Sequence, residues 1–123
     1  MKITKYGHCC LLIEENDVRI LTDPGSFTAG THSSLSNIDV IVYTHEHADH
    51  YHLDSLKQLV ANNPNVTVLC NEGVSALLDE EHMPHITITD GSHEHKTVSI
   101  VGVSGIHEEI HSTISRIQNT GYL

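Results

Sequence analysis

The stretch DVIVYTHEHADH, residues 39–50, joins an apolar run directly to a cluster of histidines. The β-branched run at 39–44 is typical of a strand that is covered on both faces of a sheet. His45 begins the cluster where this strand stops, and His47 follows two residues later. In an extended segment, side chains at positions i and i+2 project to the same side. Both imidazoles can therefore face one metal ion.

Asp49 and His50 follow the small residue Ala48, where the backbone is free to bend. A bend there would aim this second pair of side chains at a neighbouring position, so one segment could supply ligands to two ions. Imidazole nitrogens and carboxylate oxygens without a thiolate suit zinc, manganese or iron in a catalytic site. The alternative interpretation of the segment is a solvated polar loop after a strand.

Two further histidines follow the apolar run TVSIVGV, residues 97–103, which is predicted to be a buried strand. Functional residues of α/β folds gather where strands end at one edge of a sheet. His107 is therefore predicted to be a third imidazole ligand. His111 could share a face with His107 if the segment is helical, in a catalytic or substrate-contact role. It could equally be an ordinary exposed histidine.

Asp23 ends the predicted strand at 18–23 and precedes Pro-Gly. Its carboxylate could accept the second N–H of a ligating histidine and so fix the tautomer of that ring. The alternative is an aspartate that starts a turn by bonding to nearby backbone amides. His8 could reach the same region from the first strands. Exposed loop positions are expected for the remaining paired histidines, His82, His85, His93 and His95.

The hydrophobic pattern as a whole predicts a single α/β layered domain over residues 1–123. Strands are expected at 2–6, 9–14, 18–23, 39–44, 66–70, 86–89, 97–103 and from 116 onward. Helices are expected at 52–63 and 72–80, a loop at 23–34 and a turn at 90–95.

Composition limits the classes of partner. Six basic residues against sixteen acidic ones give a formal net charge of −10, which opposes nucleic-acid binding because phosphate backbones are held by clustered Lys and Arg. No apolar segment approaches the length that crosses a membrane. The three cysteines, Cys9, Cys10 and Cys70, lack CxxC spacing and are expected to be buried, reduced thiols of a cytoplasmic protein.

Taken together, these segments resemble the metallo-β-lactamase-fold hydrolases. THEHADH (44–50) is similar to the HxHxDH signature of that superfamily, and ILTDPG (20–25) looks like the strand–Asp motif that precedes it. VGVSGIHEEIH (101–111) resembles the later segment that supplies the third histidine. The start of the chain, residues 3–25, looks most like the small branch of uncharacterised hydrolases and sugar-lactone lactonases.

The resemblance implies an αββα sandwich with two divalent ions, usually zinc and otherwise manganese or iron, at one edge. This chain would be its N-terminal half, a mixed sheet with helices on one face. The implied ligands are His45, His47 and His107 for the first ion and Asp49 and His50 for the second. Asp23 would orient the site, with His8 nearby. Asp49 and His111 are the candidate catalytic residues for hydrolysis of a small ester, lactone or phosphodiester by metal-activated water.

Members of this superfamily continue beyond the position of Leu123 to a metal-bridging Asp and a final histidine. The chain is therefore expected to be a fragment of a longer protein or a half-fold that pairs with another chain. Either case leaves an edge strand and an apolar sheet face uncovered, which predicts self-association. The competing functions are an iron-dependent oxidoreductase of the same fold and a catalytically inactive metal-binding half-domain.

Overall fold

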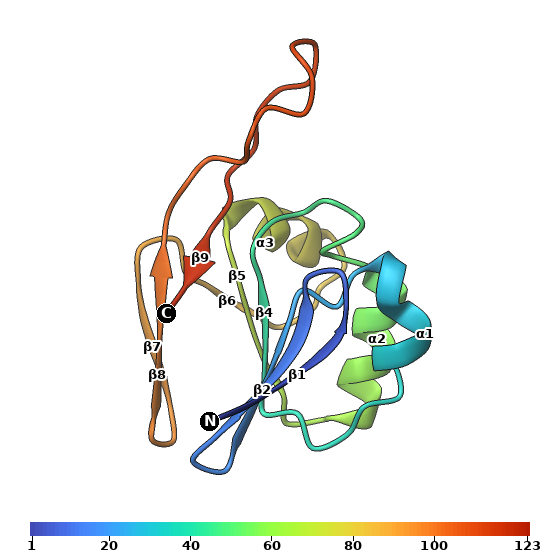
Figure 1. Cartoon of the computed structure of the whole chain (residues 1–123), viewed down its shortest axis with the longest axis vertical. Helices are drawn as coiled ribbons and strands as arrows, with labels where there is room; N and C mark the ends of the chain where they lie inside the picture. Colours follow the sequence, from blue (N-terminus) through green and yellow to red (C-terminus); the bar gives the residue numbers. More distant parts are fainter.

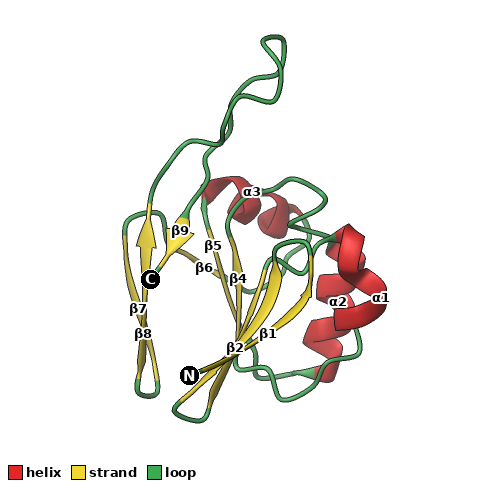
Figure 2. Cartoon of the chain, viewed as in Figure 1, coloured by secondary structure: helices red, strands yellow, loops and turns green.

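The computed structural model describes residues 1–123, which form three layers (Figure 1). The elements in chain order are β1 (Lys2–Gly7), β2 (Cys10–Glu15), β3 (Val18–Thr22), the 3₁₀ helix η1 (Ser26–Thr28), α1 (Ala29–His32), β4 (Val40–Tyr43), α2 (Leu53–Asn62), β5 (Thr67–Cys70), α3 (Glu72–Glu80), β6 (Ile86–Thr87), β7 (Gly91–His95), β8 (Val98–Val103) and β9 (Gly121–Tyr122). The helices cover one face of a larger sheet, and a smaller sheet lies on its other side (Figure 2). None of the helices is long and apolar enough to cross a membrane.

The larger sheet has the strand order β1-β2-β3-β4-β5-β6. Its first three strands pair antiparallel, whereas β3 to β6 pair parallel. The predicted mixed sheet is therefore confirmed. Because the carboxyl ends of parallel strands meet at one edge, the segments after β3 and β4 come together there. These are the segments that carry Asp23 and the histidine cluster.

Alternate residues of the larger sheet enter two separate cores. On the helical side, Leu21 and Ile41 pack with Leu56 and Leu59 of α2. On the other side, Val40 and neighbouring side chains pack towards Ile100 of β8. All four residues of β4 are buried, as predicted for a strand that is covered on both faces. Each fully buried aliphatic side chain of this kind stabilises the fold by about 1.5–3 kcal/mol.

Two local predictions are wrong between the main strands. The loop predicted at 23–34 contains η1 and α1. The turn predicted at 90–95 is largely the strand β7, which pairs antiparallel with β8, and the chain reverses at Lys96 instead. The sequence Gly-Ser-His-Glu-His in β7 is polar because the strand is at the edge of the smaller sheet and none of its residues is fully buried.

The strand predicted to be buried at 97–103 is covered on one face only. Ile100 of β8 is buried, whereas Val101 and Val103 are 36% and 47% exposed. The smaller sheet has a neighbouring layer only on the side of the larger sheet, so its other face meets solvent (Figure 1). The strands predicted at 86–89 and from 116 are each reduced to two residues. The uncovered apolar side chains of this face agree with the expectation of self-association, which itself stays a prediction.

An apolar cleft of about 430 Å³ lies between the two sheets. Its walls are aliphatic side chains of β2, β3, β4 and β8, including Leu11, Ile20 and Ile100. Cys9, Asp23 and Thr44 also line it, at the edge of the larger sheet where the predicted site residues gather. The cleft therefore opens next to the candidate site.

Candidate metal centre

Three histidines that are far apart in the sequence converge at this edge. His45 and His47 follow β4, whereas His107 comes from the segment after β8, and one ring nitrogen of each lies within 4.8 Å of one nitrogen of the others. The ring centroids of His45 and His47 are 4.8 Å apart, and that of His107 is 4.8 Å and 4.7 Å from them. The structure thus brings the three predicted ligands of the first ion together.

His107 reaches this position on an arm, residues 104–119, that extends from the body of the molecule (Figure 1). The two limbs of the arm are joined by a hydrogen bond from the amide of His107 to the carbonyl of Ile117, 2.8 Å. Its base is fixed to the end of β4, because the amide of Thr120 donates to the carbonyl of Thr44, 2.9 Å. Nδ1 of His107 donates to the carbonyl of Glu108, 2.8 Å, so Nε2 of this ring keeps its lone pair.

A hydrogen-bond relay fixes the tautomer of His45. The hydroxyl of Thr44 donates to Oδ2 of Asp23, 2.8 Å, so its oxygen can only accept from Nδ1 of His45, 2.8 Å. The lone pair of His45 must then be on Nε2. This atom is buried and has no hydrogen-bond partner. An orphaned buried acceptor is unfavourable, and a carboxylate behind an imidazole is typical of metal-bound histidines. The site therefore fits a cation at Nε2.

Asp23 also fixes the tautomer of His50, whose Nδ1 donates to Oδ2 at 2.9 Å. This hydrogen bond, opposed by burial, raises the pKa of His50. The other carboxylate oxygen, Oδ1, accepts from the amide of Thr44 at 2.8 Å. All recorded partners of the Asp23 side chain therefore lie in the strand and loop around β4, and none is an amide of its own turn. One carboxylate serves both the His45 and the His50 rings.

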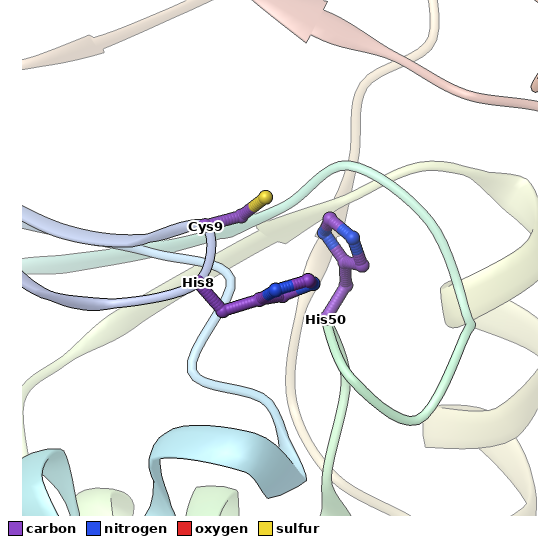
Figure 3. Close-up of side chains that lie close together, drawn as sticks. All are labelled: His8, Cys9 and His50. Carbon is purple, nitrogen blue, oxygen red and sulfur yellow. The ribbon is translucent and has the colours of Figure 1, made fainter.

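A second cluster lies beside the first and joins the β1–β2 turn to the loop after β4. Donor atoms of His8, Cys9 and His50 lie within 4.8 Å of one another (Figure 3). Asp49 belongs to the same cluster, because its Oδ2 accepts from Nε2 of His8 at 2.7 Å and lies 3.5 Å from Nε2 of His50. Burial opposes ionisation of Asp49, but the hydrogen bond from His8 and its backbone and charge interactions lower its pKa overall.

Sequence reasoning missed two residues of this centre, Thr44 and Cys9. Cys9 was expected to be buried but is exposed, whereas Cys10 is buried. Cys9 lies in the turn between β1 and β2, whereas Cys10 is the first residue of β2 and enters the core. No local pattern of the sequence distinguishes the two adjacent thiols. Partial burial raises the pKa of the Cys9 thiol, and the carboxylates of Asp23 and Asp49 raise it further.

His111 is not brought to either cluster. The segment between His107 and His111 is irregular, so the helix that could have paired the two rings does not form. His111 is exposed, and its Nδ1 lies 2.8 Å from the hydroxyl of Thr113 on the same arm. Its catalytic or substrate-contact role stays a prediction.

The charge state of His45 predicts how the metal-free protein responds to acid. Burial, with the charge of His50 next, lowers the pKa of His45 to about 4, whereas an unfolded histidine titrates near 6.5. Between these values the unfolded chain binds more protons, so the free energy of unfolding should fall as the pH falls from about 6.5 towards 4. The raised pKa of His50 adds stability as the pH falls through that raised value towards 6.5, so its effect lies mainly above this window. Urea unfolding of the chelator-treated protein at several pH values measures the slope, which His45→Gln should reduce; an equal slope in that variant would contradict the prediction.

Gly25 is the point where the loop after β3 meets the loop after β4. A Cβ at Gly25 would overlap the carbonyl of Asp49 and lie 2.6 Å from the amide nitrogen of His50. Gly25→Ala is therefore expected to displace this backbone, lower the free energy of unfolding by about 1–3 kcal/mol and weaken metal binding. Urea unfolding and metal titration measure both effects. Gly30→Ala is the matched control, because a Cβ there meets open space; equal behaviour of the two variants would contradict the proposed contact.

Comparison with known proteins identifies the family of this chain. Residues 2–123 match the family model described as the beta-lactamase superfamily domain. The chain belongs to the metallo-β-lactamase superfamily. Protein Rv0786c of Mycobacterium tuberculosis is 32% identical over 124 residues, which cover 100% of this chain and 57% of that protein. A UPF0173 metal-dependent hydrolase of Flavobacterium johnsoniae is 34% identical over 82 residues, 62% of this chain and 34% of that protein.

Solved structures of the superfamily show the same architecture. A protein from Parabacteroides distasonis superposes with a TM-score of 0.76 at 21% identity, over 98% of this chain and 53% of that chain. A diphosphatase of the PhnP family gives 0.69 at 21%, over 93% and 47%. CmlA, a diiron β-hydroxylase from Streptomyces venezuelae, gives 0.67 at 19%, over 82% and 23%. The expected metallo-β-lactamase-type fold is confirmed, and the chain spans about half the length of the first two of these structures.

Proposed function

We propose that this chain carries the metal-binding part of a hydrolase that acts on a small ester, lactone or phosphodiester. The observation that carries the proposal is the buried Nε2 of His45, which has no partner and faces two more imidazoles. Three neutral imidazoles with an open position are a typical ligand set of a catalytic rather than a structural zinc site. The family relatives named as metal-dependent hydrolases support the same reaction class.

The residues have distinct proposed roles. The first ion would be held by His45, His47 and His107, and the second by Asp49 and His50. A bound divalent ion supplies a Lewis acid and a water that loses its proton near neutral pH. Asp23 keeps the protons on Nδ1 of both His45 and His50, so that their Nε2 lone pairs face the site. Asp49 is part-exposed beside His8, where its carboxylate can also accept a proton during the reaction.

The test is turnover by the metal-loaded protein. Chelator-treated protein is reloaded with zinc or manganese and offered chromogenic esters, lactones and phosphodiesters. Hydrolysis of one class that depends on added metal and is lost in His47→Ala is the expected result. A folded, metal-loaded protein that hydrolyses none of the three classes faster than His47→Ala would overturn the proposal.

A redox role is the competing proposal, because the fold is also similar to that of CmlA, a diiron β-hydroxylase. Elemental analysis of protein purified without added metal separates the two. Zinc or manganese at two ions per chain would favour hydrolysis, whereas redox-active iron would favour the oxidoreductase. Two bound ions without turnover on any substrate class would leave the third possibility, an inactive metal-binding half-domain.

A further inference from the structure

We propose that Cys9, together with His8, is a ligand of the second metal ion, so that the β1–β2 turn completes the position that His50 and Asp49 begin. The inference rests on the proposed metal-dependent function. It adds two ligands from a segment outside the HxHxDH motif, one of them a thiolate.

The distances allow His8, Cys9 and His50 to share one ion, with the carboxylate of Asp49 next to both imidazoles. Donors of a single zinc ion lie about 2.0–2.3 Å from it and therefore at most about 4.6 Å from each other. The donor atoms of His8, Cys9 and His50 all lie within 4.8 Å of one another, so small side-chain rotations suffice. Sγ of Cys9 and the His8 and His50 rings converge from two different loops (Figure 3). The His8–Asp49 hydrogen bond of 2.7 Å marks a proton that a cation could replace.

The backbone holds Cys9 at this place. Its carbonyl accepts from the hydroxyl of Thr22 at 3.0 Å, and the same oxygen of Thr22 accepts from the amide of Leu11 at 3.0 Å. The two bonds tie Cys9 and Leu11 to Thr22 at the carboxyl end of β3, next to Asp23. His8 adopts a positive φ of 46° in the turn before it. Cys10 is buried in the helical core, so it cannot exchange roles with Cys9.

The donor set has a chemical consequence. Binding replaces the thiol proton of Cys9, which is released to solvent, by a bond between its sulfur and the ion. One thiolate, imidazoles and a carboxylate suit zinc or cobalt, whereas manganese and magnesium prefer oxygen donors. The second position should therefore select thiophilic ions, while the three-histidine position has no such sulfur ligand.

Cobalt(II) tests the inference by a signal that is independent of activity. Metal-free protein loaded with cobalt is expected to bind two ions per chain and to show a near-ultraviolet thiolate-to-cobalt charge-transfer band. Cys9→Ser should lose this band and weaken or lose one ion. Cys10→Ala is the matched control, because it removes the neighbouring thiol, which faces the core, and should keep both. Circular dichroism of each variant verifies that it is folded.

Each outcome decides the inference. Cobalt bound without the band in the unmodified protein, or a band that persists in Cys9→Ser, would overturn the ligand role of Cys9. In those cases metal-dependent turnover that is lost in His47→Ala would leave the proposed function standing. Failure of the unmodified protein to bind any cobalt would overturn both. Loss of the band in Cys9→Ser and its retention in Cys10→Ala would support Cys9 as a thiolate ligand. This result would hold whether or not the protein turns over any substrate.

Discussion

His47→Ala is expected to remove one metal ion per chain and to leave the fold intact. His47 is one of three imidazoles whose donor atoms converge, and it is only partly buried, so its loss removes a ligand with little packing. Mutating even an outer partner of a metal ligand weakens binding about 10–100-fold, so losing the ligand itself should weaken it at least as much. Elemental analysis after dialysis and calorimetric titration with zinc measure the effect.

His93→Ala is the control for this experiment. His93 is also a partly buried histidine, but it lies on β7, outside both clusters. The His93→Ala variant should bind as many ions as the unmodified protein. An unchanged ion count and affinity in His47→Ala would contradict every version of the metal hypothesis, including the redox and the non-catalytic alternatives.

Asp23→Asn is expected to weaken both metal positions at once. Asp23 is 3% exposed and its carboxylate accepts hydrogen bonds from Thr44 and His50. In the variant, the amide NH₂ that replaces one carboxylate oxygen would face a hydrogen-bond donor and could not accept from it. The His45 and His50 rings are then free to adopt the other tautomer, in which Nε2 carries the proton and has no lone pair for an ion. We expect about 10–100-fold weaker binding and a free energy of unfolding lower by about 1–3 kcal/mol.

Asparagine is the informative substitution because it keeps the side-chain shape and tolerates the positive φ of 40° at this position. The hydrogen bond from His50 to Asp23 is the largest cause of the raised pKa of His50. In Asp23→Asn the pKa of His50 should therefore fall, which an NMR titration of the metal-free protein detects. Asp17→Asn is the control, because Asp17 is exposed in a turn outside both clusters and also has a positive φ, 60°. Wild-type affinity together with an unchanged pKa of His50 would rule out the relay.

Much of the fold could be predicted where a hydrophobic pattern repeats without interruption. The four buried residues of β4 and the helix α2 follow from such patterns, as does the mixed sheet from the resemblance. The strand β7 could not be predicted in this way, because the edge of a small sheet places no demand for apolar residues on Ser92–His95. Short helices such as α1 depend on contacts beyond their own sequence.

The candidate site was predictable where its residues are close in sequence. His45, His47, Asp49 and His50 all belong to one motif, and their convergence follows from one bend after β4. The position of Cys9 depends instead on hydrogen bonds between the β1–β2 turn and β3, which no local pattern encodes. The roles of the predicted ligands themselves stay predictions until metal is measured.

The arm that carries His107 links metal binding to the stability of the whole chain. It leaves the body after β8, and its base is held to the end of β4 by Thr120. An ion shared by His107 and His45 would cross-link the arm to the end of β4, beside the hydrogen bond from Thr120 to Thr44. Because such an ion binds the folded chain and not the unfolded one, metal occupancy and the free energy of unfolding rise together.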